Sequence, residues 1–262
     1  MRTRSDPKVD VPTAQGGASS VARAREDHVV ERVNAALEQE IIFGILPPRH
    51  RLVEDEIMAR FDVTRHGVRK VLNLLIRRGL AIHQPNRGAL VRAYSPSEVE
   101  ELYGMRDLLQ SAAIRAMPLP IQEGVAVELR GIHRKHLEAG GASDYPAIFT
   151  LNNQFHGVFF AACGNATLAE AIETYAWRTH PIRSQGFADQ SYLAEAQADH
   201  AAIIEAACAG DRDRLDALNR QHILRPMELY NRSMIARLAV TPQANTTQLG
   251  LNHQRRERSE QT

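Results

Sequence analysis

The sequence predicts a mainly α-helical protein of two domains, and three observations support this. Apolar residues recur at helical spacing along most of the chain. A single hairpin pattern with turn residues interrupts them after residue 80. The charge also divides: residues 49–92 hold ten Lys and Arg against four Asp and Glu, whereas residues 95–235 hold twelve against eighteen. A basic module joined to an acidic one is typical of a nucleic-acid-binding domain attached to a second domain.

The composition narrows the class of protein. With 262 residues, 44% of them hydrophobic and 24% charged, the chain is expected to be globular. Aromatic residues make up only 5%, so stacking on single-stranded nucleic acid is a poor explanation for the basic region. There is no run of about 18 apolar residues and no segment typical of a secretory signal, and Cys163 and Cys208 fall on helical apolar stripes. We therefore expect a cytoplasmic protein with reduced cysteines and no membrane contact.

The chain is expected to begin with an arm followed by a first helix. Residues 1–25 are rich in Gly, Ser, Ala and charged residues and show no sustained period, which predicts disorder. From His28 to Phe43, apolar residues at helical spacing predict a helix that stops at Gly44 and the prolines beyond it. This helix opens the first domain, which we place at residues 26–94.

Two short helices joined by a tight turn are predicted within residues 55–80. In the second helix, apolar residues recur at helical spacing and must pack inward: Val68, Val71, Leu72, Leu75 and Ile76. Thr64 is expected to cap this helix, which leaves Arg65 in a first turn whose free N–H groups favour an anion such as phosphate. His66 and Arg69 point away from the apolar stripe. This pattern fits a DNA-binding helix-turn-helix, and it also fits an ordinary amphipathic hairpin with a solvated basic face.

The next segment favours DNA binding. The sequences AIHQ and ALVRAY flank Pro-Asn-Arg-Gly, which predicts two short strands around a turn in which Gly88 takes a positive φ. A hairpin directly after a recognition helix forms a wing. From this wing, Arg87 can reach a groove or backbone beside the groove that the helix enters.

The segment GILPPRHRLVEDEIMARFDVTRHGVRKVLNLLIRRGLAIHQPNRGALV resembles the winged-helix domain of the GntR family of bacterial transcription regulators. The similar features are Gly-x-Leu-Pro-Pro, an acidic residue after Arg-Leu, the Val-Thr-Arg-x-x-Val-Arg motif, and Arg-Gly in the wing. The resemblance implies a homodimer that binds double-stranded operator DNA. The DNA contacts that the resemblance implies are Thr64, Arg65, Arg69, Arg87 and Gly88. We add His66 to them, because it faces outward from the same helix. The chain departs from the family at His66-Gly67, where Thr-Pro is usual, and at Asp55, where many members carry a basic residue.

The second domain is expected to be an antiparallel all-α bundle over residues 95–238, followed by a disordered tail at 239–262. Ser95-Pro96-Ser97-Glu98 forms a capping box with proline at the first helical position, which predicts a new helix. Downstream the pattern is helical throughout, with Gly and Pro between the segments. The expected helices are about 96–116, 121–139, 145–163, 166–179, 190–209 and 211–236.

Arg106 lies within the apolar face of the first helix of this bundle. A buried guanidinium needs an anionic partner, because burying it alone is very costly. The partner is either a protein carboxylate or the carboxylate of a ligand, which arginine binds bidentately. Tyr103 and Gln110 flank Arg106 at helical spacing and are candidates for orienting such an effector.

Four further polar residues interrupt apolar stripes on three helices: Asn152, His156, His200 and His222. A single histidine in such a stripe is commonly a hydrogen-bonded core residue. Three of them in one small bundle can instead converge on one divalent cation, and imidazoles with an amide oxygen suit Zn, Ni or a related first-row metal. His133 and His136, next to Arg134 and Lys135, are expected to form a solvated helix face.

The second domain resembles the FCD ligand-binding domain of the FadR and VanR branches of the same family. The resemblance is carried by Arg106-x-x-Leu, Asn152-x-x-Phe-His156, Gly-Asn, Asp-His200 and Gly-Asp. For metal-binding members, the resemblance implies that an Asp or Asn and three His bind a metal, and that the carboxylate of an effector completes the coordination of this metal. The corresponding residues here are Asn152, His156, His200 and His222. Fatty-acyl-binding relatives lack these histidines, which favours a small organic acid as the effector, and we expect a repressor that this acid releases. The alternatives are a metal-dependent enzyme with a DNA-binding appendage and a regulator whose metal is purely structural.

Overall fold

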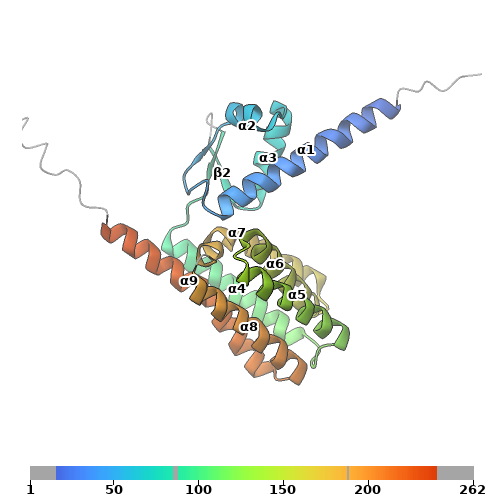
Figure 1. Ribbon diagram of the computed structural model, residues 1–262, viewed down its shortest axis with the longest axis vertical. Helices are drawn as coiled ribbons and strands as arrows, with labels where there is room; N and C mark the ends of the chain where they lie inside the picture. The colour runs from blue at the N-terminus through green and yellow to red at the C-terminus, as the bar shows by residue number, and fades with distance from the viewer. Residues whose placement is uncertain (1–15, 85–87, 188, 241–262) are drawn as a thin grey trace, which may run out of the picture. The chain divides into compact units, whose positions relative to one another are not determined.

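The computed structural model describes residues 16–84, 88–187 and 189–240, and the chain divides into two compact units. One unit ends at Ala93 and the other begins at Tyr94, close to the capping box that starts the next helix. The segments 1–15 and 241–262, which lie in regions expected to be disordered, fall outside the described residues, and so do residues 85–87 of the predicted wing turn. Figure 1 shows the helices and strands of both units.

The first unit is a winged helix-turn-helix, as predicted. Its elements in chain order are α1 (Gly16–Ile42), β1 (Arg51–Leu52), α2 (Glu54–Phe61), α3 (Arg65–Arg77), β2 (Ala81–Gln84) and β3 (Gly88–Val91). The helix α1 begins twelve residues before the predicted start at His28. Alanine and arginine are good helix formers, and extending an existing helix costs far less than starting one, which explains the longer helix.

The wing is a three-stranded antiparallel sheet in the order β1, β3, β2. The predicted hairpin is present, and the two-residue β1, which the sequence pattern did not indicate, pairs with the far side of β3. Gly88 has a φ of +80°, and a Cβ atom there would lie 2.9 Å from the carbonyl oxygen of Leu52. This close approach of β1 and the positive φ both require glycine.

The core of the first unit lies between α1, α3 and the sheet. Val68, Val71 and Leu75 of the predicted stripe are fully buried. They pack with Val33 and Leu37 of α1. The opposite face of α3 is left to solvent, as the helical spacing predicted.

The second unit is a helical bundle, which confirms the predicted fold class. Its elements are α4 (Pro96–Ala116), α5 (Glu123–Gly141), α6 (Tyr145–Ala161), α7 (Ala166–Arg183), the short 3-10 helix η1 (Ser184–Gly186), α8 (Gln190–Ala209) and α9 (Arg212–Val240). The largest packing interfaces join α5 with α6, α4 with α9 and with α7, and α8 with α5 and with α9. Phe155, Phe159 and Phe160 of α6 lie at the centre of the core.

The helix α7 continues past the proline at which it was expected to stop. Pro181 cannot donate a backbone hydrogen bond, but the turn persists to Arg183, and the backbone N–H of Ser184 donates to the carbonyl of His180. Thr179 and Ile182 are buried on either side of the proline, so packing stabilises this last turn. The extra turn places Arg183 inside the bundle.

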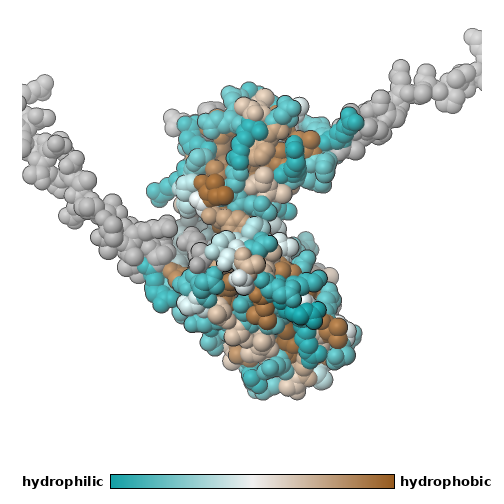
Figure 2. Space-filling model, viewed as in Figure 1, coloured by the Kyte–Doolittle hydropathy of each residue, from teal (hydrophilic) through white to brown (hydrophobic). Residues whose placement is uncertain are grey.

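No helix within residues 16–84, 88–187 and 189–240 is long and apolar enough to cross a membrane. The visible face of each unit in Figure 2 is mainly hydrophilic, with apolar side chains in small scattered groups. Cys163 and Cys208 are both free thiols.

Candidate functional site

The start of α3 has the cap that the sequence predicted. The Thr64 side-chain oxygen accepts a hydrogen bond of 3.1 Å from the backbone N–H of Gly67. A Cβ atom at Gly67 would lie 2.6 Å from a methyl group of Val63, so the tight turn between α2 and α3 favours glycine here. Arg65, His66 and Arg69 are exposed on the first turns of the helix, where cations can meet a phosphate.

Two of these arginines pair with carboxylates of α2. The Arg65 guanidinium lies 2.7 Å from Asp55 Oδ1 and 3.3 Å from Glu54 Oε2, and Arg69 Nε lies 3.2 Å from Glu54 Oε1. The ion pairs are exposed, so each contributes little to stability. A DNA phosphate would therefore compete with Glu54 and Asp55 for both arginines.

An open groove of about 600 Å³ lies between α3 and the wing. The polar residues lining it include Arg65, Arg69 and Asn73 of α3, His83 and Gln84 of β2, and the carboxylates Glu54 and Asp55 of α2. The recognition helix and the wing therefore share one surface. Arg87, the predicted contact at the wing tip, lies outside the described residues.

In the helical unit, three imidazoles come together from α6, α8 and α9. The ring centroids are 5.2 Å apart for His156 and His200, 5.2 Å for His156 and His222, and 4.8 Å for His200 and His222. One nitrogen of each ring can be chosen so that all three lie within 4.8 Å of one another. The predicted convergence of these three residues is thus present in the structure.

The polar atoms of this cluster are buried with few hydrogen-bond partners. His200 is 0% exposed, and both of its ring nitrogens lack a partner. Within the described residues Nδ1 of His156 also lacks a partner, as does the side-chain nitrogen of Asn152, although that amide N–H calls for an acceptor and not for a cation. Buried polar atoms without partners are costly, so this donor set fits a bound cation.

Asp199 orients one of the three rings. Its Oδ2 atom lies 3.3 Å from Nδ1 of His222, and Arg225 binds the same carboxylate at 3.1 Å. This leaves Nε2 of His222 facing Nε2 of His156 at 3.3 Å. A carboxylate behind a histidine is the usual support for a metal ligand, because it fixes the ring and raises its basicity.

Burial keeps these rings neutral, which is the form that binds metals. Burial lowers the pKa of His156 and of His200 well below its usual value, and the neighbouring His222 adds to both effects. The pKa of His222 is lowered by burial too, but Asp199 opposes that change.

A pocket of about 640 Å³ adjoins the cluster. Its polar lining residues include Arg106, Gln110, Asn153, His180 and Arg183, together with the exposed carboxylates Glu170 and Glu173. Phe160 and Trp177 are among the apolar and aromatic side chains that line it. A second, much smaller cavity contains Arg106, His136, Asn152, Arg183 and His222 among its lining residues, so Asn152 and His222 line one cavity with both arginines.

Arg106 and Arg183 are 3% and 6% exposed, and among the described residues neither forms an ion pair with a carboxylate. Within the part of the chain that the structure describes, Nε and one terminal nitrogen of Arg106 have no hydrogen-bond partner, and Arg183 donates to Asn153 Oδ1 at 2.8 Å. Burial lowers the pKa of Arg106 and lowers that of Arg183 to about 10. Two buried cations facing one cavity have a strong need for an anion.

Of the other two predicted effector residues, one lines the pocket and one does not. Gln110 lines the large pocket, as expected. Tyr103 is 0% exposed and lines neither cavity. It packs against Val99 and Ile182, and its ring centroid lies 5.2 Å from the guanidinium carbon of Arg106. Tyr103 therefore contacts Arg106 without lining either cavity.

The expectation of a solvated face at His133 and His136 is wrong. His136 is 2% exposed and His133 is half-buried. The charged neighbours Arg134 and Lys135 misled this interpretation, because consecutive residues of a helix point in different directions. His136 follows buried Leu129 by seven residues, which is the spacing that places it on the inward face.

Arg183 and Asp199 were not predicted as site residues. Arg183 follows a proline that was expected to end α7, so no helical face could be assigned to it. The sequence identifies Asp199 only as the neighbour of His200. Its role depends on the packing of α8 against α9, which the sequence pattern of neither helix contains.

Two family models match the chain. Residues 29–91 match the family described as bacterial regulatory proteins, gntR family, and residues 101–225 match the FCD domain. An uncharacterized HTH-type transcriptional regulator, BphR of Paraburkholderia xenovorans, is 26% identical over 212 residues, which are 79% of this chain and 86% of that protein. The HTH-type transcriptional repressor RspR of Escherichia coli is 24% identical over 198 residues, covering 74% and 86%.

Solved structures show the same fold. The chain is similar to McbR/YncC of E. coli, with a TM-score of 0.67 and 17% identity over 79% of this chain and 98% of that one. It is also similar to a GntR transcriptional regulator from Rhodococcus, with a TM-score of 0.62 and 22% identity over 77% and 96%.

Proposed function

The chain belongs to the GntR family of DNA-binding transcription regulators and carries an FCD domain, and from this premise we propose that a small carboxylate acts as its effector. The acid binds in the helical unit beside a metal ion, and its binding lowers the affinity of the winged helix for operator DNA. The protein then acts as a repressor that the acid releases. As all of the matched relatives named above are regulators, the chain is a regulator and not an enzyme.

The observation that carries this proposal is the pair of buried guanidiniums. Arg106 and Arg183 reach the cavity that adjoins the three imidazoles, and no carboxylate of the described residues pairs with them. An anion that enters the pocket gains two charge-assisted interactions without needing to draw either arginine out of water. Arginine binds a carboxylate through two parallel hydrogen bonds, which favours this class of ligand.

The residues that would hold the metal are His156, His200 and His222, with Asn152 as a fourth ligand. At about 2.0 to 2.1 Å from a tetrahedral zinc ion, two nitrogens lie roughly 3.3 Å apart, which matches the separation of the facing Nε2 atoms of His156 and His222. The donor set of imidazoles and an amide suits Zn or Ni. When bound, the metal would supply positive charge beside the pocket and could accept an oxygen of the acid as a further ligand.

The pocket supports an acid of small to moderate size. Its volume of about 640 Å³ is within the range of small-molecule sites, and its lining combines the two buried arginines with apolar side chains. Phe160 and Trp177 can contact the apolar part of a ligand whose carboxylate lies at Arg106. An acid with one carboxylate and a short carbon body fits this combination.

The regulatory response requires a dimer with two reading heads. Each winged helix reads one half-site, and the acid changes the spacing or mobility of the two heads. To move the protein from mostly able to mostly unable to bind DNA, the acid must prefer one state by several kcal/mol, on the order of 5 for a complete switch. Two buried arginines and a metal can provide such a preference. The relative RspR is named a repressor, which supports the sign proposed here.

The proposal is tested by DNA binding. Preferred sites are selected from a random double-stranded library, and the affinity for the best site is measured with and without a panel of small carboxylic acids. One acid should weaken DNA binding about tenfold or more. In Arg106→Ala, DNA affinity without acid should be unchanged while the response to acid is lost. Arg115→Ala, at an exposed position of the same helix, should respond like the native chain. If no acid changes DNA affinity, the effector proposal fails and the metal is left with a structural role.

A further inference from the structure

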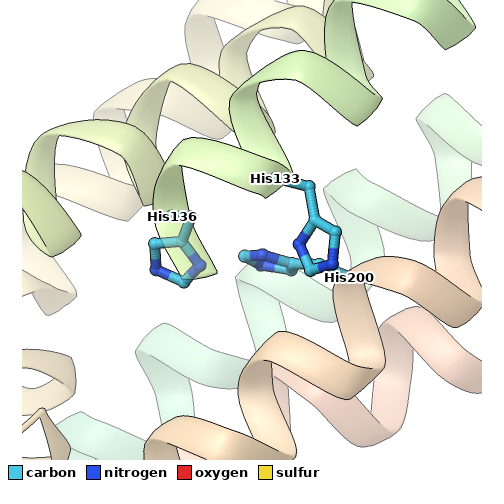
Figure 3. Close-up of side chains that lie close together, drawn as sticks. All are labelled: His133, His136 and His200. Atoms are coloured by element: carbon cyan, nitrogen blue, oxygen red, sulfur yellow. The ribbon is translucent and has the colours of Figure 1, made fainter. Parts of the chain in front are cut away.

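A second group of three histidines lies beside the first. His133 and His136 project from α5 toward His200 on α8, as Figure 3 shows. The ring centroid of His200 is 5.3 Å from that of His136 and 6.2 Å from that of His133. One nitrogen from each of the three rings can be chosen so that all lie within 4.8 Å of one another.

Close packing of α5 on α8 creates this group. His133 and His136 are three residues apart, so their side chains lie on adjacent turns of one helical face. The side-chain nitrogen of Gln197 donates a 2.9 Å hydrogen bond to the backbone carbonyl of His136. A Cβ atom at Gly140 would lie 2.5 Å from that same nitrogen, so glycine permits the approach. These contacts fix the part of α8 that carries His200 opposite His136.

The rings in this group have unmet hydrogen-bonding capacity. His136 is 2% exposed and His200 is 0% exposed, and among residues 16–84, 88–187 and 189–240 the ring nitrogens of both have no hydrogen-bond partner. Nδ1 of the half-buried His133 also lacks a partner. If these residues served only in packing, their nitrogens would be expected to form hydrogen bonds or apolar residues would stand in their place. Each buried polar atom without a partner lowers stability by about 1 to 3 kcal/mol.

We propose that His133, His136 and His200 form a second site for a divalent first-row transition metal. Three imidazole nitrogens are a donor set for Zn, Ni, Co or Cu. Zinc would require nitrogens roughly 3.3 Å apart, so closing the group takes movements of about 1 Å that rotation of the side chains can provide. The site is argued from its own residues and stands whether or not the pocket binds an acid.

The two metal sites share His200. A neutral imidazole has one proton and therefore one free nitrogen lone pair, so His200 can bind only one cation at a time. The two sites therefore compete for His200 at neutral pH. A cation at His133 and His136 draws His200 away from His156 and His222, which links metal occupancy at the α5 side of the bundle to the pocket on the other side.

The test isolates the second site by disabling the first. The double variant Asn152→Ala/His222→Ala keeps His200 and removes two ligands of the pocket-side site. The full-length variant is titrated with Co²⁺ alone, and binding is followed by calorimetry and by the visible absorption of the ion. It should bind one Co²⁺ per chain. Adding His136→Ala should weaken this binding about tenfold or more. Replacing a residue that only supports a metal ligand already lowers metal affinity by that much, and replacing the ligand itself should lower it at least as far.

Two further variants make the result decisive. His133→Ala changes a half-buried position with little risk to folding and should also weaken Co²⁺ binding to the double variant. Lys135→Ala, at an exposed position on the same helix, should leave it unchanged. Far-ultraviolet circular dichroism confirms that each variant is folded. The inference is overturned if the double variant binds no Co²⁺, or binds it equally well after both histidines of α5 are replaced. Failure of the pocket-side site would show differently, as unchanged metal affinity of the native chain on replacing His222.

Discussion

His156 and His222 are 66 residues apart in the chain, and their Nε2 atoms lie 3.3 Å apart in the folded protein. Two neutral rings at this distance can share one hydrogen bond or bind one cation. Asp199 contacts the other nitrogen of His222, and the ring of His200 lies beside both rings without a hydrogen bond to any described residue. The arrangement as a whole therefore favours the cation, and several measurable consequences follow from it.

Asp199 is expected to act on metal affinity through His222. Asp199→Asn keeps the shape of the side chain and removes its charge, so metal affinity should fall about 10- to 100-fold, measured by competition with a chelator. Glu195→Gln is the matched control, because Glu195 pairs with the same Arg225 but does not contact His222. Equal losses in the two variants would assign the effect to Arg225 instead.

Acid should destabilise the metal-free protein. Burial lowers the pKa of His136 to about 4 and holds those of His156 and His200 well below the usual value near 6.5. The unfolded chain takes up protons near pH 6.5 while the folded chain does not, so stability falls as the pH drops from about 6.5 toward 4. Urea unfolding of chelator-treated protein at several pH values measures this loss. His136→Gln, which lacks one of these groups, should lose less stability over the same range.

On the DNA-binding unit, Arg69 is predicted to contact a phosphate. Arg69→Ala should weaken binding to the selected DNA site and flatten the slope of log K against log salt by about 0.9. Arg77→Ala removes a charge from the far end of α3, which does not line the groove, and should have a smaller effect. An unchanged salt slope in Arg69→Ala would remove this residue from the interface.

Glu54 should oppose DNA binding, because it pairs with both Arg65 and Arg69. Glu54→Gln frees these cations, and DNA affinity should rise about two- to fivefold, in line with the small contribution of exposed ion pairs. Glu56→Gln removes the same charge from the same turn without freeing an arginine of α3. If both variants bind DNA equally tightly, the gain comes from net charge alone.

Thr64 should contribute to stability as well as to the DNA surface. Thr64→Ala removes the side-chain acceptor for the Gly67 N–H and should cost about 1 kcal/mol of unfolding free energy. Thr64→Ser retains the hydroxyl and should recover most of it. Thermal unfolding of the full chain distinguishes the two, and equal losses would mean that the methyl group matters more than the cap.

The elements with strong local signals were predicted well. The helix beginning at Pro96 follows from its capping box, and the Thr64 cap and the positive φ of Gly88 follow from the residues themselves. The convergence of His156, His200 and His222 was predicted because each interrupts an apolar stripe, and a stripe identifies the inward face of its helix.

The features that depend on how helices pack were not predicted. The buried position of His136 was concealed by the charged residues before it, and Arg183 by the proline of α7. The second histidine group depends on the packing of α5 against α8, to which the hydrogen bond from Gln197 to the His136 carbonyl contributes. No periodicity within a single helix contains such information, since it arises from two helices together.

A thermal-shift screen tests the central claim most directly, because any ligand that prefers the folded state raises the unfolding midpoint. Small carboxylic acids are tested against the metal-loaded chain, the chelator-treated chain and Arg106→Ala. The account predicts that one acid stabilises the metal-loaded chain, by about 2.7 kcal/mol at 100 times its Kd, and stabilises the other two far less. An acid that stabilises all three equally, or a panel in which none stabilises the metal-loaded chain, would contradict it.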